Sequence, residues 1–176
     1  MTKFEEFEQV VAKLRAPDGC PWDREQTHKS LKKPCIEEVA EVICGINILD
    51  ETGNPDNLKE ELGDLLLQVV MHARIAEEEG YFTMDDVIQG IIDKMVRRHP
   101  HVFGDAVVSG SGEVLTKWEE IKKWEKAGKE WTEAYLSEAF EEAKELIEEA
   151  KERKGVGERE GVLGCIVVLE YADLYL

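Results

Sequence analysis

One stretch of this chain restricts its fold more than any other: residues 62–71 (LGDLLLQVVM) are apolar on nearly every side of a helix. Such a helix is expected to be buried all round, inside a bundle of other helices. Yet Glu61, Asp64 and Gln68 form one polar stripe along it. The stripe carries no Lys or Arg, and a buried carboxylate without a partner is costly. A bound metal ion is the better interpretation of Asp64 and, by extension, of Glu61.

The rest of the chain is also helical in pattern. Apolar residues recur at helical spacing between Gly and Pro breaks, and Thr83 with Asp86 three residues later resembles a capping box. Pro34 is expected to kink or restart the second helix. Only residues 164–169 (GCIVVL) are ambiguous between helix and strand. We predict helices at about residues 3–15, 27–49, 55–79, 83–98, 113–128 and 132–154.

These elements predict an all-α protein built as an antiparallel helical bundle from the first five helices. We expect residues 1–128 to form one domain. Residues 129–176 would add a very acidic helix and a short apolar tail, whose role the sequence does not reveal. The tail from Val162 to Leu176 contains two acids and is too short to span a bilayer.

Charge and cysteine content limit the partners. With 22 basic and 39 acidic residues, the chain has a net charge of −17. Polymeric nucleic acid and anionic membranes should repel it, and a phosphate-bearing small molecule needs a metal ion or a local basic cluster. Its four cysteines are scattered, and residues 1–7 do not begin a signal peptide. We therefore expect a cytoplasmic protein with free thiols.

A second helix carries carboxylates at helical spacing, in the segment EEVAE (37–41). Glu38 and Glu41 share one face, as Glu61 and Asp64 do, and a short turn between the helices favours antiparallel packing. Four carboxylates would then converge. All-oxygen ligands favour Mg²⁺, or Mn²⁺ in its place. Di-iron bundles use Glu-x-x-His, and His72 does not fill that role.

The alternative for the first of these helices is a solvated acidic face, because its apolar residues lie on the opposite arc. Pro34 and Gly45 favour the metal interpretation, since neither has a long side chain and both share the glutamate face. The apolar residues of this helix are Ile36, Val39, Ala40, Ile43 and Ile46.

Residues 94–101 (KMVRRHPH) supply the opposite charge. Lys94, Arg97 and Arg98 lie three and four residues apart, so at least two share a face. They would clamp phosphate oxygens, although a cationic helix terminus explains one or two of them. Trp22 and Trp118 would stack on a base or pack in the core, and single tryptophans are more often structural.

The ordered motifs resemble the MazG family of nucleoside triphosphate pyrophosphohydrolases, over about residues 7–126. The EExxE then ExxD pattern is weak alone but specific in combination with the others. The matching segments are CPWDREQTH (20–28), EEVAE (37–41), EELGDLLLQVVMHARIAEE (60–78), RRHPHVFGD (97–105) and KWEEIKKWE (117–125).

The resemblance implies a Mg²⁺-dependent enzyme that hydrolyses a nucleoside triphosphate to the monophosphate and pyrophosphate. It implies a homodimer, or a dimer of dimers, in which a second subunit completes the bundle. Glu37 and Glu60 match acids that orient or deprotonate water. The other implied residues are the metal ligands Glu38, Glu41, Glu61 and Asp64, the triphosphate contacts Lys94, Arg97 and Arg98, and the base contact Trp118.

Two alternatives remain open. One is a different hydrolase on the same carboxylate bundle, such as a phosphatase or an enzyme preferring dUTP or dCTP. The other is a catalytically weak or inactive module for dimerisation or regulation that retains the metal site. Family members often carry two catalytic copies, and this chain carries no full second copy.

Overall fold

The computed structural model describes residues 1–155, and every regular element in that range is a helix. The eight helices of this range confirm the all-α prediction. The ambiguous segment 164–169 and the apolar tail from residue 162 lie outside the described residues. No helix of the described part is long and apolar enough to cross a membrane. In order, the helices are α1 (Lys3–Arg15), α2 (Pro21–Glu25), α3 (Lys32–Thr52), α4 (Asp56–Glu78), α5 (Met84–Arg98), α6 (Pro100–Phe103), α7 (Ser111–Lys126) and α8 (Thr132–Lys154).

The chain divides into two compact units. Of the described residues, the first unit contains 1–75 together with 140–155, and the second contains 76–139. Thus α1, α2, α3, most of α4 and the C-terminal part of α8 belong to the first unit. The helices α5, α6 and α7 belong to the second.

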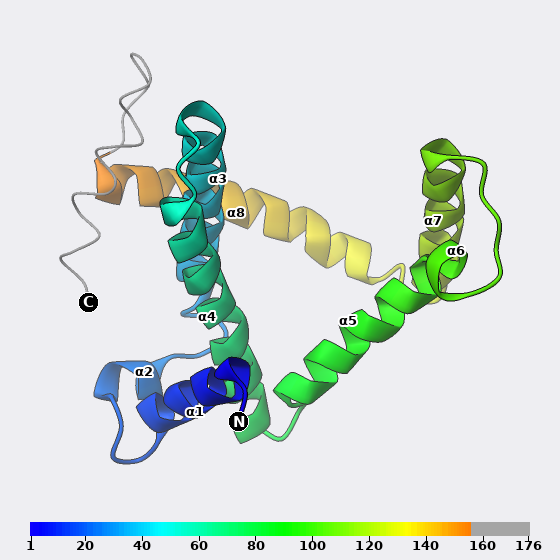
Figure 1. Ribbon diagram of the computed structural model, residues 1–176. Coiled ribbons are helices and arrows are strands. Elements are labelled where there is room, and N and C mark those ends of the chain that lie inside the picture. The colour runs from blue at the N-terminus through cyan, green and yellow to red at the C-terminus, as the bar shows by residue number, and fades with distance from the viewer. Residues whose placement is uncertain (156–176) are drawn as a thin grey trace. The chain divides into compact units, whose positions relative to one another are not determined.

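Helices α3 and α4 form an antiparallel pair at the centre of the first unit (Figure 1). Gly53 ends α3 in the left-handed conformation, with φ of 74°, and Asn54 Oδ1 accepts a hydrogen bond from the backbone N–H of Asp56 at the start of α4. The helices approach so closely at Gly45 that a Cβ there would lie 2.8 Å from Leu58 Cα. Gly45 therefore serves helix packing, rather than leaving room for a ligand as the sequence suggested.

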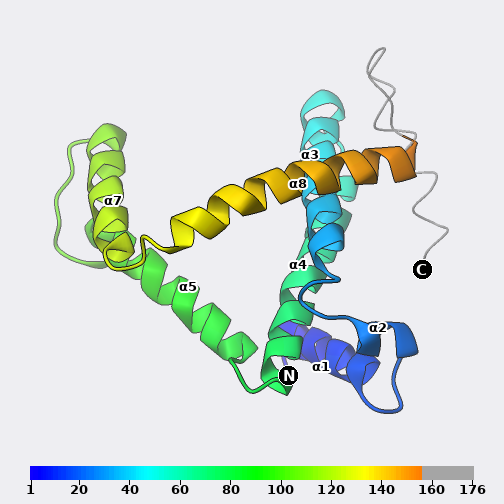
Figure 2. The ribbon, with the colours of Figure 1, turned by 180° about the vertical axis from the view of Figure 1, so that it is seen from behind.

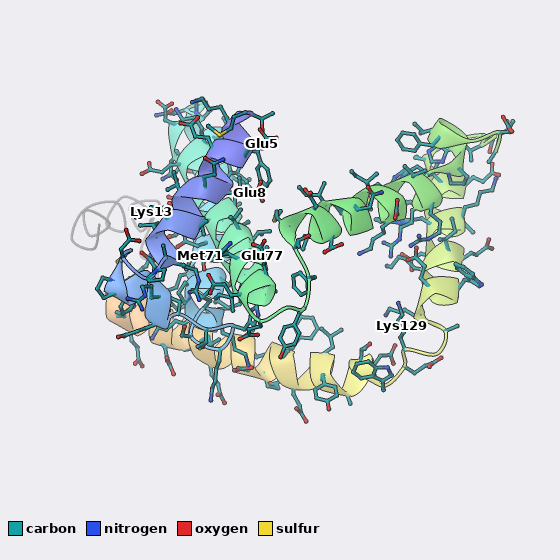
Figure 3. All side chains as sticks on the ribbon, turned by 90° about the horizontal axis from the view of Figure 1, so that it is seen from below. Glu5, Glu8, Lys13, Met71, Glu77 and Lys129 are labelled. Atoms are coloured by element: carbon teal, nitrogen blue, oxygen red, sulfur yellow. The ribbon has the colours of Figure 1, made fainter. Side chains whose placement is uncertain are left out.

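The core of the first unit lies on one side of α4. Helix α1 lies across the C-terminal half of α4, on which Met71 is labelled (Figure 3). Arg15 of α1 donates to the carbonyl of Asp23 in α2 and to that of Gln26 just after it, at 2.5 and 3.2 Å. The buried apolar residues of this unit are Val11, Leu31, Val70, Met71, Ala73 and Ile75.

The opposite side of α4 contradicts the expectation that residues 62–71 are buried all round. Leu62, Leu66 and Val69 are exposed by 51, 39 and 40%. Among residues 1–155, the neighbours of α4 lie on its α1 and α3 sides, and these exposed side chains mark a third side that the described residues leave open.

In the second unit, α5 begins with the predicted capping box. Thr83 Oγ1 accepts from the backbone N–H of Asp86 at 3.3 Å, and Asp86 Oδ2 accepts from the backbone N–H of Thr83 at 2.8 Å. Helix α5 ends at Arg98, and Pro100 opens the four-residue α6. The sequence predicted irregular chain from residue 100, because a single turn of helix has no measurable periodicity.

Pro34 neither kinks nor restarts α3, because the helix begins only at Lys32 and Pro34 lies in its first turn. There its missing N–H has no intrahelical partner to lose. The predicted start at residue 27 was too early. Thr27 and Ser30 instead form a turn in which each side-chain oxygen accepts from the other residue's backbone N–H, at 3.1 and 2.9 Å.

Candidate metal centre

Three carboxylates meet between α3 and α4. Glu38 comes from α3, and Glu61 and Asp64 come from successive turns of α4. One oxygen from each lies within 4.8 Å of the others. This separation suits three oxygen ligands around one hard divalent cation. The structure thus brings together three of the four predicted metal ligands.

The amphipathic pattern of α3 is reversed relative to an ordinary surface helix. Glu37 and Glu41 on its acidic face have side chains exposed by only 12 and 20%. Val39, Ile43 and Ile46 on its apolar face are exposed by 44, 54 and 49%. The acidic face is therefore directed into the first unit, and it is not the solvated face of the alternative interpretation.

The cluster keeps its negative charges close together at a cost. Burial raises the pKa of Glu61, and Asp64 and Glu38 raise it further, against the hydrogen bond that Asn57 Nδ2 donates to Glu61 Oε1 at 2.9 Å. Burial also raises the pKa of Glu38, and the charge of Asp64 raises it further, against the charge of Lys154, which lowers it. Within residues 1–155, no basic side chain forms an ion pair with Glu38, Glu61 or Asp64. A divalent cation fits this donor set and removes the repulsion.

The remaining predicted acids have other surroundings. Glu41 forms an ion pair with Lys154 of α8, and Glu37 Oε2 forms one with Arg153. The second oxygen of Glu37 is buried and has no hydrogen-bond partner among the described residues. Glu60 is exposed on α4, and its charge contributes to the raised pKa of Glu61.

A histidine pair continues the polar stripe of α4. His72 Nδ1 lies 2.7 Å from His28 Nδ1, and the two rings are nearly parallel. Cys35 Sγ lies 3.6 Å from His72 Nε2. Burial and the neighbouring His28 lower the pKa of His72, and the pair joins the turn before α3 to α4. The signal was the spacing of Asp64, Gln68 and His72, each four residues apart.

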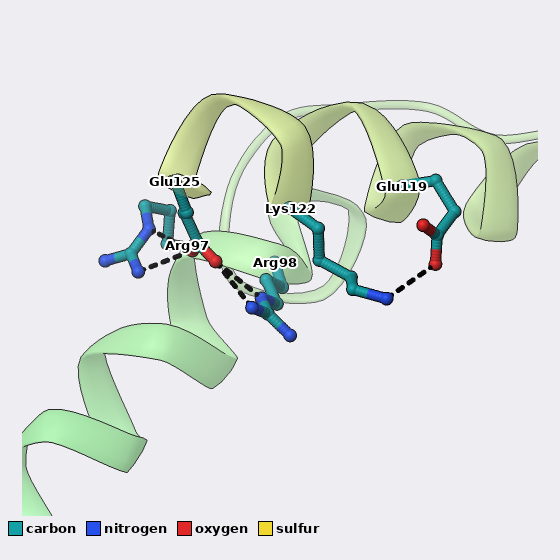
Figure 4. A network of polar contacts seen from close by, with 5 residues as sticks. All are labelled: Arg97, Arg98, Glu119, Lys122 and Glu125. Atoms are coloured by element: carbon teal, nitrogen blue, oxygen red, sulfur yellow. Dashed lines mark hydrogen bonds and ion pairs between the residues drawn. The ribbon is translucent and has the colours of Figure 1, made fainter. Parts of the chain in front are cut away.

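The two arginines of the predicted phosphate clamp bind a carboxylate of the second unit itself. Arg97 Nε and Arg98 Nε donate to the two carboxylate oxygens of Glu125 on α7, at 2.7 and 3.0 Å (Figure 4). These bonds lower the pKa of Glu125 to about 2. Lys94 is exposed on α5. Sequence reasoning missed Glu125, although it lies in the KWEEIKKWE segment.

Trp118 lies beside this arginine pair. Arg98 Cζ and Lys122 Nζ are 5.8 and 5.6 Å from its ring centroid, and its Nε1–H is buried without an acceptor among residues 1–155. Trp22 differs, because it is 70% exposed on α2 and is no core residue of this chain.

The acidic cluster and the basic residues of the predicted clamp lie within one segment that matches a known family. Residues 26–103 match the MazG nucleotide pyrophosphohydrolase domain. This chain carries a MazG domain. The match includes all the predicted metal ligands and basic residues, from Glu38 to Arg98, and ends before Trp118 and Glu125.

Relatives extend the similarity around the MazG domain. The chain is 53% identical over 126 residues to a Thermotoga maritima protein named nucleoside triphosphate pyrophosphohydrolase/pyrophosphatase MazG, covering 72% of this chain and 46% of that protein. It is 45% identical over 130 residues to the Escherichia coli K12 nucleoside triphosphate pyrophosphohydrolase, covering 73 and 48%. A Bacillus subtilis relative, the uncharacterized protein YabN, is 55% identical over 124 residues, covering 70 and 24%. The chain thus spans less than half the length of these relatives.

Proposed function

We propose that this protein is a Mg²⁺-dependent hydrolase that converts nucleoside triphosphates to monophosphate and pyrophosphate, clearing non-standard or excess nucleotides. The observation that carries the proposal is the meeting of Glu38, Glu61 and Asp64 within 4.8 Å in a MazG domain. Two relatives named as nucleoside triphosphate pyrophosphohydrolases support it.

In this proposal Glu38, Glu61 and Asp64 hold Mg²⁺, or Mn²⁺ in its place, and Glu41 joins them when free of Lys154. A bound cation would polarise the triphosphate and lower the pKa of a coordinated water. Glu61 is kept in position by the hydrogen bond from Asn57. Because the donor set is all oxygen, without thiolate or imidazole, it favours a hard cation over zinc.

Glu37 and Glu60 are proposed to handle the attacking water. The free, buried oxygen of Glu37 is an acceptor that can orient a water or take its proton. Glu60 is exposed beside Glu61, so a proton that reaches it can pass to solvent.

Lys94, Arg97 and Arg98 are proposed to contact the triphosphate. The two arginines already bind one carboxylate in parallel, and phosphate oxygens satisfy the same donors. For both arginines to donate all their N–H groups to phosphate, their hydrogen bonds to Glu125 must break. Trp118 is proposed to contact the base, and the unpaired Nε1–H gives it a donor for that purpose.

A second copy of the chain is proposed to complete the bundle, as a homodimer or a dimer of dimers. The apolar face of α3 and the open side of α4 are both exposed in one chain, and together they offer an apolar surface of the kind that obligate dimers bury. The residues of this stripe are Val39, Ile43 and Ile46 on α3, and Leu62, Leu66 and Val69 on α4.

Two contacts favour the second candidate, a catalytically weak or inactive module that keeps the metal site. Glu125 holds both arginines of the proposed clamp, and Lys154 holds the proposed ligand Glu41. If these contacts persist with substrate present, turnover will be slow even where metal binds.

Product analysis tests the proposal. Common and modified nucleoside triphosphates are incubated with the protein and Mg²⁺, and pyrophosphate and orthophosphate are measured separately. Pyrophosphate release that Asp64→Asn abolishes and Glu51→Gln retains is the expected result, because Glu51 is an exposed acid at the end of α3. Orthophosphate as the product rejects the assignment. Metal binding without any product favours the inactive module.

A further inference from the structure

The last turns of α8 lie across the acidic face of α3 and are held there by charge (Figure 2). Lys32 and Lys33 at the start of α3 pair with Glu142 and Glu149, at 2.7 and 3.1 Å. The acids further along α3 pair with the basic end of α8: Glu37 with Arg153 and Glu41 with Lys154.

The order of these pairs argues for specific docking. Among the paired residues, the basic ones come first on α3 and the acidic ones follow, whereas on α8 the acidic ones come first and the basic ones follow. The four pairs occur in the same order along both helices, so a shift of either helix by a turn would set like charges together.

Apolar contact in this docking is limited, because the only apolar side chains of residues 140–154 that are even half-buried are Ala143, Leu146 and Ala150. Phe140 and Ile147 of α8 are exposed by 61 and 38%. Three of the four pairs include a side chain that is half exposed, and exposed pairs are individually weak. An interface of this kind holds α8 in place and still releases it readily.

We propose that the basic end of α8 is an intramolecular counter-ion that competes with the divalent cation for the acidic face of α3. The proposal rests on the proposed metal site. Lys154 bonds a carboxylate oxygen of Glu41, the predicted fourth ligand, and Arg153 bonds Glu37 beside Glu38. The oxygen of Glu41 that Lys154 occupies is unavailable to a metal ion.

Competition has a defined consequence for affinity. A cation that needs Glu41 binds only the fraction of molecules in which α8 has released it, so its measured Kd is the intrinsic Kd divided by that fraction. If α8 is docked about nine times as often as it is free, removing its basic end should tighten binding about tenfold.

The test compares two double variants of the full chain. Arg153→Gln/Lys154→Gln removes the competing charges. Lys144→Gln/Lys151→Gln removes the same charge from α8 but alters only pairs within that helix, with Glu141 and Glu148. Mn²⁺ binding is measured by titration calorimetry. We expect about tenfold tighter binding in the first variant and nearly wild-type binding in the second. Equal Kd values in both variants and the wild type overturn the proposal.

Hydrogen exchange gives a second readout that needs no activity. Mn²⁺ should speed amide exchange in residues 140–154 of the wild type, because the cation displaces α8, and Asp64→Asn should abolish that change. Exchange in α8 that Mn²⁺ leaves unchanged, with binding intact, contradicts the competition. If neither the wild type nor the Arg153→Gln/Lys154→Gln variant binds Mn²⁺, the metal site itself fails, which is a distinct outcome.

Discussion

Glu61 carries a negative charge that the proposed metal site uses and that destabilises the fold in the absence of metal. Its side chain is almost fully buried beside two other carboxylates, and its only described donor is Asn57. Helical spacing predicted this meeting with Glu38 and Asp64, because positions three apart on one helix face a neighbour together. The same spacing also placed Glu41 on that face, but its cation comes from Lys154, more than a hundred residues later, which no local pattern reveals.

We predict that Glu61→Gln stabilises the metal-free protein near neutral pH by about 1 kcal/mol, or roughly 4 °C in Tm. Glutamine still accepts from Asn57 but carries no charge. The pKa values of Glu38 and Glu61 are raised on folding, so wild-type metal-free stability falls as pH rises above the ordinary carboxyl value of 4.5.

Thermal unfolding with and without Mg²⁺ measures both effects. The wild type should gain stability on adding Mg²⁺, and Glu61→Gln should gain little. Glu51→Gln serves as the control for net charge. A metal-free Glu61→Gln protein less stable than the wild type would show that this carboxylate is not under repulsion.

His72 predicts a pH dependence of opposite sign. Burial and His28 lower the pKa of His72 in the folded state. Below the ordinary value of 6.5, the unfolded chain therefore binds more protons at this residue than the folded chain does. Stability should therefore fall as pH drops from about 7 through 6.5 and below. Urea unfolding at a series of pH values should show this slope in the wild type and a weaker one in His72→Gln. Equal slopes in the two proteins would mean that another group is responsible.

At the scale of whole elements, caps and turns that depend on neighbouring residues could be predicted from the sequence. A misplaced helix start and a contact between two helices could not. The Thr83–Asp86 capping box and the turn at Gly53 needed only neighbouring residues, and both are present. The start of α3 was misplaced because Thr27 and Ser30 satisfy each other's backbone. The arginine–Glu125 contact joins α5 to α7, and sequence spacing does not say which acid a cation will choose.

The α3–α4 pair depends on one small residue. We predict that Gly45→Ala destabilises the fold by about 1–3 kcal/mol, since its Cβ would lie 2.8 Å from the Leu58 backbone and force the helices apart. Gly90→Ala in α5 is the control, because nothing lies within 4 Å of its added Cβ, and it should gain about 0.5–1 kcal/mol from helix propensity.

Urea unfolding compares these two variants, and Mn²⁺ titration then follows the acidic cluster. Gly45→Ala should also weaken Mn²⁺ binding, because Glu38 is held by α3 and Asp64 by α4. A Gly45→Ala protein as stable as Gly90→Ala would mean that the two helices pack less tightly than their backbone separation indicates.

At the scale of the whole molecule, the apolar stripe on α3 and α4 leads to the last prediction. A strongly acidic chain gains nothing from leaving six apolar side chains in water, whereas burying them against a second copy returns hydrophobic free energy. The sequence predicted all-round burial of residues 62–71, and a single chain does not provide it. The exposure of these apolar side chains is the physical argument for a second copy of the chain that buries them.

We predict that Ile43→Glu/Leu66→Glu converts the protein from an oligomer of at least twice the 20.0 kDa chain mass to a monomer. Two like charges would be desolvated at each face, which costs far more than the lost apolar contact. Sedimentation at micromolar concentration gives the mass, and circular dichroism should show that the helices survive, because both side chains are exposed in one chain. Val107→Glu, an equally apolar and 85% exposed site in the second unit, should keep the oligomer. If the wild type sediments at the mass of one chain, the open side of α4 stays in water. The proposal that a second copy completes the bundle would then be wrong.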